Sequence, residues 1–194
     1  MRLHICSVLA LPLLAFASQA DQVPMDAGPI PQTAFQPTLA DLLTIEPSTS
    51  IFYSYARELA SSDMFANTRG GPITLLVPTN KAVMALARKP HQDPEPIDTG
   101  VIVTEEEFDA RSRANVERWV SAHIIPQSPI TLDAETTYPT LLDGKSITFA
   151  PTSNGKADAP AWSRVVIDGR VHITAMHEAS NGVLFLIDGT ILLD

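Results

Sequence analysis

The chain has 194 residues, 45% of them hydrophobic, and its 13 basic and 22 acidic residues give a net charge of −9. This length and apolar content suit one domain with its own core, and the negative charge argues against nucleic acid and anionic lipid surfaces as partners. The single cysteine, Cys6, lies near the start of the chain, so a disulfide framework and a cysteine-based zinc site are excluded.

The first 20 residues have the layout of a secretory signal peptide. Arg2 precedes a largely apolar run over residues 5–17, and the small residues Ser18 and Ala20 follow it. The run is shorter than the roughly 20 apolar residues that a membrane span needs, so a cleaved signal is favoured over an anchor. We expect residues 1–20 to be removed, Cys6 to leave with them, and no stable membrane insertion.

A proline-rich leader is predicted over residues 21–36, where Pro24, Pro29 and Pro31 fall among few periodic apolar residues. One domain is predicted over residues 37–194. Its first helix starts at Thr38, because Asp41 stands where the acid of a capping box is found, and it ends before Pro47.

A second helix should follow, with Ser48 or Ser50 as its cap. Four residues at helical spacing are predicted to form its buried face: Phe52, Tyr55, Ala56 and Leu59. An aromatic stripe of this kind is more typical of core packing than of a ligand site.

The stretch from Ile73 to Leu86 organises the chain. Residues 73–77 form a short run of β-branched and aliphatic residues, the pattern of a strand that is buried on both faces. Pro78 ends the strand because proline cannot donate a ladder hydrogen bond, and Thr79 or Asn80 can cap a following helix. Four residues of that helix are expected to cover the sheet: Val83, Met84, Leu86 and Ala87.

Residues 88–100 are predicted to form a loop because of their three prolines. Thr104 followed by three glutamates predicts the start of a long helix, since the hydroxyl caps it and the acids oppose its dipole. Its predicted inner face comprises Phe108, Val116, Trp119, Val120 and His123.

After Leu132 the apolar period changes from 3.6 to 2. Two hairpins are predicted, one pairing residues 141–142 with 145–149 about Asp143-Gly144, the other pairing 164–167 with 170–174 about Asp168-Gly169. Asn181-Gly182 should open a long strand over residues 183–187, and Asp188-Gly189 should turn the chain into residues 190–193. Helices come first and strands last, so the predicted class is α+β with a largely antiparallel sheet.

Three of these segments together resemble the fasciclin domain. They are TLLVPTNKAVMAL around Pro78, the segment 119–125 with a histidine at its centre, and ASNGVLFLIDGTILL at residues 179–193. The resemblance implies a β-wedge with helices packed along one edge, covering roughly residues 37–193. Seven residues match its motifs as structural positions: Pro78, Thr79, Asn80, His123, Asn181, Gly182 and Asp188.

The family resemblance implies a non-enzymatic adhesion or interaction module that binds a protein or glycan surface, with no cofactor and no catalytic or metal-binding residue. Two departures bear on function. Ala122 stands where animal adhesion members carry a tyrosine linked to integrin binding, and Phe185 stands where the second motif often has histidine.

A hydrolase that uses carboxylates near His123 is the alternative. His123 is otherwise interpreted as a buried histidine bonded to backbone near the turn at residues 78–80. His172, His177 and Glu178 do not fit a zinc helix, because that motif needs histidines four apart on one helical face. No Gly-x-Ser-x-Gly string occurs.

Short single-domain members of the family in fungi resemble this chain. The signal layout directs the chain into the secretory pathway, and the expected destination is a vacuole lumen, the cell wall or the extracellular space. The sequence leaves the ligand and the oligomeric state open.

Overall fold

The computed structural model describes residues 36–93, 104–132, 135–152 and 158–193. The predicted signal peptide, nearly all of the predicted leader and most of the predicted loop at residues 88–100 lie outside the described residues. Within the described part, no helix is long and apolar enough to cross a membrane.

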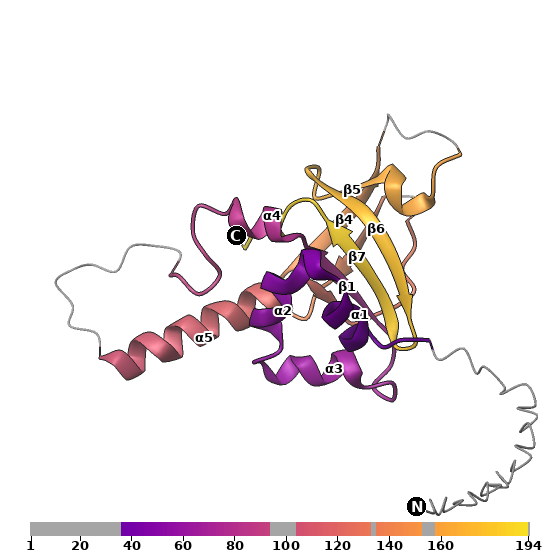
Figure 1. Cartoon of the computed structure of the whole chain (residues 1–194). Coiled ribbons are helices and arrows are strands. Elements are labelled where there is room, and N and C mark those ends of the chain that lie inside the picture. The colour runs from indigo at the N-terminus through magenta and orange to yellow at the C-terminus, as the bar shows by residue number, and fades with distance from the viewer. Residues whose placement is uncertain (1–35, 94–103, 133–134, 153–157, 194) are drawn as a thin grey trace, which may run out of the picture. The chain divides into compact units, whose positions relative to one another are not determined.

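The fold is mixed α+β, as predicted, and is built around one seven-stranded sheet (Figure 1). The strands are β1 (Ile73–Pro78), β2 (Ile124–Ile125), β3 (Thr136–Pro139), β4 (Ser146–Pro151), β5 (Val165–Ile167), β6 (Val171–Ala179) and β7 (Gly182–Ile187), in the order β2-β1-β7-β6-β5-β4-β3. All pairs are antiparallel except β1 with β7. The Leu141 N–H donates to the Ile124 carbonyl at 2.7 Å, so the chain after β3 meets β2 and the sheet curls toward a barrel.

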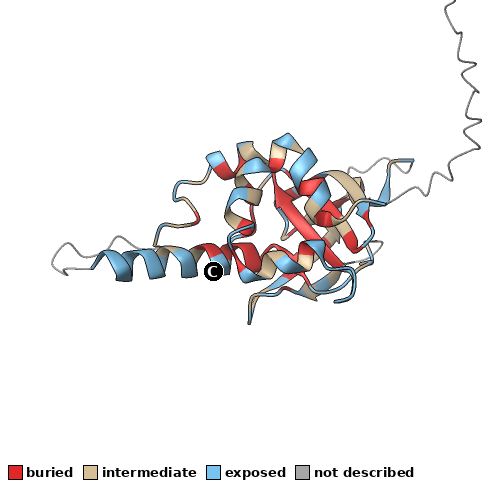
Figure 2. Cartoon of the chain, turned by 60° about the horizontal axis from the view of Figure 1, so that its bottom comes forward, coloured by how far each residue is buried: buried red, intermediate tan, exposed pale blue. Residues whose placement is uncertain are grey.

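The sheet has a hydrophobic core on each face, and β7 alternates between them. Leu184 and Leu186 belong to the core shared with the helices, while Phe185 and Ile187 belong to the core inside the curled sheet. All six residues of β1 are buried, which confirms the prediction of a strand buried on both faces (Figure 2).

Five α-helices accompany the sheet: α1 (Leu39–Ile45), α2 (Ser50–Ala56), α3 (Asp63–Ala66), α4 (Asn80–Met84) and α5 (Glu105–Ser121). Three short 3₁₀ helices, η1 (Pro47–Thr49), η2 (Ala60–Ser62) and η3 (Ala161–Arg164), complete the described elements. Helices α1, α2 and α3 gather on one side of β1 and β7 (Figure 1).

The predicted capping box at the start of α1 is present, and the predicted threonine cap of α5 is also part of a capping box. The Thr38 hydroxyl accepts from the Asp41 N–H at 3.2 Å at the start of α1, and the Thr104 hydroxyl accepts from the Glu107 N–H at 3.3 Å at the start of α5. Each satisfies a backbone donor that has no partner within its helix.

Three predicted core residues are exposed. Helix α4 is only five residues long, so Met84 and Ala87 do not reach the sheet, and Met84 is 62% exposed. Phe108 is 49% exposed because the first two turns of α5 extend beyond the core, which Figure 2 shows as a pale blue end of the helix. Helical periodicity specifies a face of a helix, but not how far the neighbouring core reaches along it.

One predicted strand is also wrong. Residues 141–142 lie in the turn between β3 and β4 rather than in a strand. Residues 190–193 follow β7 and the bend at residues 188–189 without a ladder. The Asp143-Gly144 and Asp168-Gly169 turns are in place, with Gly144 at φ 77° and Gly169 at φ 71°. Turn residues therefore located the hairpins more reliably than the apolar residues beside them.

Candidate functional site

The parallel pair β1–β7 brings two of the sequence motifs together. Pro78 is in register with Ile187 at one end of the pair, and Ile73 is in register with Gly182 at the other. The Thr79 N–H donates to the Ile187 carbonyl at 3.1 Å. The motif residues are therefore divided between the two ends of one strand pair.

Asn80 connects two helices. Thr79 is the residue that caps α4, through a 3.3 Å bond from the Ala82 N–H to its hydroxyl. The Asn80 Oδ1 atom instead accepts from the Ile51 N–H at 2.9 Å, and its amide donates to the Pro47 carbonyl and to the Ser50 hydroxyl, both at 3.0 Å. Helix α2 has no side-chain cap from Ser48, Thr49 or Ser50, which corrects the prediction of a serine cap.

Asn181 plays the corresponding role at the other end of the strand pair. It is 2% exposed, and its Oδ1 atom accepts from the Leu39 N–H at 2.9 Å. Its amide donates to the Phe65 carbonyl at 2.8 Å and to the Met64 carbonyl at 3.1 Å. One buried side chain thus fastens α1 and α3 to the start of β7.

Gly182 is the first residue of β7, and no larger residue fits at this position between β1 and β7. An added Cβ atom would lie 1.9 Å from the Ile73 carbonyl oxygen, and the residue has φ 150°. Side-chain atoms cannot approach backbone this closely, so β7 can start beside β1 only with glycine here.

His123 is fully buried after the end of α5. Its Nδ1–H donates to the Trp119 carbonyl at 2.7 Å, and its Nε2 atom accepts from the Ile191 N–H at 3.2 Å. The ring packs against Trp119 and Phe52 at centroid distances of 4.7 and 5.8 Å. The bonds are to backbone, but to residues 119 and 191, not to the turn at residues 78–80.

Burial lowers the pKa of His123 from 6.5 to about 4, although the bond to the Trp119 carbonyl opposes this shift. The same two bonds fix the neutral Nδ1–H tautomer, because a carbonyl only accepts and the Ile191 N–H only donates. An imidazole with both nitrogens engaged and no exposed surface has no access to a substrate, which removes the basis for a hydrolase built on His123.

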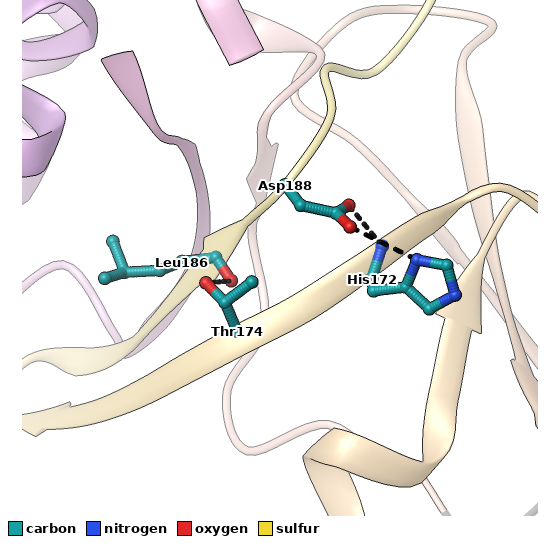
Figure 3. A network of polar contacts seen from close by, with 4 residues as sticks. All are labelled: His172, Thr174, Leu186 and Asp188. Carbon is teal, nitrogen blue, oxygen red and sulfur yellow. Dashed lines mark hydrogen bonds and ion pairs between the residues drawn. The ribbon is translucent and has the colours of Figure 1, made fainter. Parts of the chain in front are cut away.

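Asp188 forms the polar pair that sequence reasoning missed (Figure 3). One carboxylate oxygen accepts from the His172 N–H at 2.7 Å, and the other lies 3.3 Å from the His172 Nδ1 atom. The ladder slips between Ile173 and Ala175, and the intervening Thr174 hydroxyl donates to the Leu186 carbonyl at 3.2 Å. Only the register of β6 against β7 reveals this pair, and both of its side chains are about half exposed.

An open hollow of about 580 Å³ with both polar and apolar lining residues lies among α1, α2 and α3. We call it the helix hollow, and its polar lining residues are Tyr53, Arg57, Ser62, Asp63 and Asn67. Arg57 forms an exposed ion pair with Glu58 at 3.3 Å, and Tyr53 packs partly against the helix-side core. The hollow combines an aromatic ring with a guanidinium, a carboxylate, an amide and a hydroxyl.

Metal-binding geometry is not found in the described ranges, where no three His, Cys, Asp or Glu side chains come close enough to hold an ion. His172 and His177 lie on strand β6, so the helical spacing of a zinc motif does not arise there.

Comparison with known proteins identifies one family. The model of the Fasciclin domain matches residues 47–193. A FAS1 domain-containing protein of Aspergillus fumigatus is 36% identical over 48% of this chain and 42% of its own length, and one of Emericella nidulans is 28% identical over 80% of this chain and 62% of its own. The chain therefore spans less than two thirds of these relatives.

A FAS1 domain-containing protein of Saccharomyces cerevisiae is 26% identical over 80% of this chain and 62% of its own length. Among solved structures, the FAS1 domain pair of the insect cell adhesion molecule Fasciclin I matches 81% of this chain and 51% of that chain, with a TM-score of 0.55 and 16% identity. At that identity the likeness concerns the fold alone.

Proposed function

Because this chain belongs to the fasciclin domain family, whose members generally serve as adhesion or interaction modules, we propose that it is a non-enzymatic binding module of the secretory pathway. Its partner is a protein or glycan surface. The observation that carries its non-enzymatic character is that the polar motif residues serve the fold: Asn80 and Asn181 fasten helices, and His123 is fully buried.

The helix hollow supports a glycan as the partner. Sugars are bound by hydrogen bonds from planar polar groups and by packing of ring C–H groups on aromatic faces, and Arg57, Asp63 and Asn67 lie with Tyr53 around one cavity. Its volume of about 580 Å³ falls within the range of ligand sites. The net charge of −9 favours a neutral glycan over an acidic one.

Biolayer interferometry tests the proposal. It measures binding of the secreted chain to soluble fragments of fungal wall glucan, chitin and mannan. We expect saturable binding of one class, weakened at least tenfold by Arg57→Ala, since the guanidinium is lost from the cavity while its ion pair is exposed and contributes little stability. Arg170→Ala is the matched control, because Arg170 is an exposed arginine outside the hollow.

The outcomes separate the alternatives. If saturable glycan binding occurs and Arg57→Ala leaves it unchanged, the helix hollow is not the glycan site, but the chain is still a binding module. Capture of a lumenal or wall protein without glycan binding identifies a protein partner. Two results contradict the proposal. One is the absence of saturable binding to any glycan or protein at micromolar concentration. The other is hydrolysis of a glycan, detected as new reducing ends, that His123→Gln abolishes.

For the compartment, we infer a vacuole lumen, the cell wall or the extracellular space. The support is the signal-like layout of residues 1–20. A fluorescent protein fused to the C-terminus and expressed in a filamentous fungus distinguishes these destinations, and retention in the cytosol would contradict all of them.

A further inference from the structure

The core inside the curled sheet opens at one end. Three residues of β7 face this core, and their burial decreases along the strand: Ile187 is fully buried, Phe185 is 2% exposed, and Val183 is only partly buried. Met176 of β6 pairs directly with Phe185 and is also partly buried. The core is therefore closed near Ile187 and open near Val183.

A pocket of about 330 Å³ occupies this open end, and we call it the barrel-mouth pocket. Phe185, Val183 and Met176 of the sheet line it together with Trp162 of η3 and with Ile130 and Thr131 of the segment after β2. It shares no lining residue with the helix hollow. The inference below is therefore independent of the proposed glycan site.

The segment after β2 is held in place at this mouth. The Thr131 N–H donates to the Tyr138 hydroxyl at 2.8 Å, and that hydroxyl donates to the Thr131 carbonyl at 3.3 Å. Tyr138 in turn packs edge-on against Phe149 of the inner core at 5.9 Å. The rim is thus tied through the partly buried Tyr138 to the buried Phe149 of the core.

The lining determines the chemistry of an occupant. Among the residues that the structure describes, the pocket lining contains no ionisable side chain, and its polar side-chain groups are the Thr131 hydroxyl and the Trp162 indole N–H. A charged molecule would lose its hydration here without compensation. Two aromatic residues, Trp162 and Phe185, supply faces and edges against which a flat ring packs favourably.

The volume determines the size. An apolar cavity of roughly 150 Å³ holds one benzene ring, and ligand sites begin at about 300 Å³. We propose that the barrel-mouth pocket binds a neutral, flat apolar molecule of two fused rings carrying at most one hydroxyl group. The rings lie between Trp162 and Phe185, and the hydroxyl bonds at the rim with Thr131.

The test uses the full chain with 2-naphthol as the probe, which is neutral at pH 7. We expect saturable binding with a dissociation constant on the order of 100 µM, as ligand efficiency for a molecule of this size indicates. Binding should quench tryptophan emission, and Trp162→Phe should remove the quenching while calorimetry still detects binding. Quenching that persists in Trp162→Phe reports on Trp119, the other tryptophan, and overturns the proposal.

Val183→Lys blocks the pocket with a charged chain. Val183 lies opposite the exposed Glu178 on β6, so the new ammonium has a cross-strand partner and the fold is expected to survive. Affinity should fall at least tenfold. Val166→Lys is the matched control, because Val166 is also partly buried but lies on β5 outside the pocket, and its affinity should remain within twofold of the wild type.

Three further results overturn the proposal: no saturable binding up to the solubility limit of 2-naphthol, equal affinity in Val183→Lys, or concentration-dependent self-association that Val183→Lys abolishes. The last would mean that a second copy occupies the pocket. If Val183→Lys does not fold, the site is tested in the wild type by nuclear Overhauser effects between naphthol protons and the Met176 methyl group. Their absence overturns the proposal.

Discussion

The side-chain oxygen of Asn80, the first residue of α4, accepts a hydrogen bond from the backbone N–H of Ile51 in the first turn of α2. A helix that lacks a cap of its own thus receives one from another helix. We predict that Asn80→Ala lowers the free energy of unfolding by about 1–2 kcal/mol, because a cap and two further hydrogen bonds are lost. Urea denaturation followed by circular dichroism measures this.

Asn80→Asp should fall between Asn80→Ala and the wild type. The carboxylate keeps the acceptor for Ile51 but cannot donate to Pro47 or Ser50. Equal stability of Asn80→Ala and the wild type would show that water replaces the cap.

Asn181→Ala is expected to cost more, about 3 kcal/mol or above. Its removal leaves the Leu39 N–H and the carbonyls of Phe65 and Met64 without their side-chain partner in a buried site, and each unsatisfied group costs about 1–3 kcal/mol. Asn115→Ala is the control, since within the described residues that amide donates one hydrogen bond, to the Asp93 carboxylate, and its loss should cost at most about 1 kcal/mol. Similar losses for the two variants would refute the role given to Asn181.

Gly182→Ala separates steric contact from backbone conformation when it is compared with Gly144→Ala. Gly144 has φ 77° and open space around its Cβ position, so alanine there should cost about 1–2 kcal/mol through its backbone alone. At Gly182 the methyl group meets the Ile73 carbonyl, and we expect a loss of at least about 3 kcal/mol or an unfolded chain. Thermal unfolding of both variants measures the difference, and equal melting temperatures would contradict it.

Stability should decrease in acid because of His123. The pKa is about 4 in the folded chain against 6.5 ordinarily, so the unfolded chain binds more protons between these values. The stabilisation is complete above pH 6.5 and is lost as the pH falls toward 4, by about 3 kcal/mol in total. Urea denaturation from pH 7.5 to pH 4 measures the loss.

One variant isolates this effect. His123→Gln should be less stable at pH 7 but should show a shallower pH dependence, because the titrating group is gone. Asp41 and Glu46 have pKa values lowered by hydrogen bonds with Thr38 and Ser48. Their stabilising contribution is lost only as the pH falls below their ordinary pKa values, and both residues are present in the wild type and in the variant. A wild-type slope retained in His123→Gln would contradict the assignment.

Local features of the fold could be predicted from the sequence because both partners of each interaction are close in the chain. The capping boxes of Thr38 and Thr104 join residues three apart, and the Asp-Gly turns need only two residues. The strand at residues 73–77 was recognisable by its composition, since a run buried on both faces has no polar alternation.

The polar connections of the candidate site could not be predicted in the same way. Asn80 and Ile51 are 29 residues apart, and Asn181 and Leu39 are 142 residues apart, so nothing in the local pattern links them. The family resemblance indicated that these asparagines matter, but only the register of β1, β6 and β7 shows which backbone groups they reach. The exposure of Phe108, the helix hollow and the barrel-mouth pocket likewise depend on how far the packed core extends, which the local sequence does not specify.

The parallel pairing of β1 with β7 also affects how the chain is made. The ribosome completes β1 about 110 residues before β7, an interval of roughly 5–20 s at ordinary rates of elongation. Throughout that interval β1, whose residues are all buried in the folded chain, lacks β7, the longer of its two neighbouring strands. Nascent chains should therefore be prominent clients of chaperones until β7 emerges, and an elongation stall between the two strands should promote aggregation.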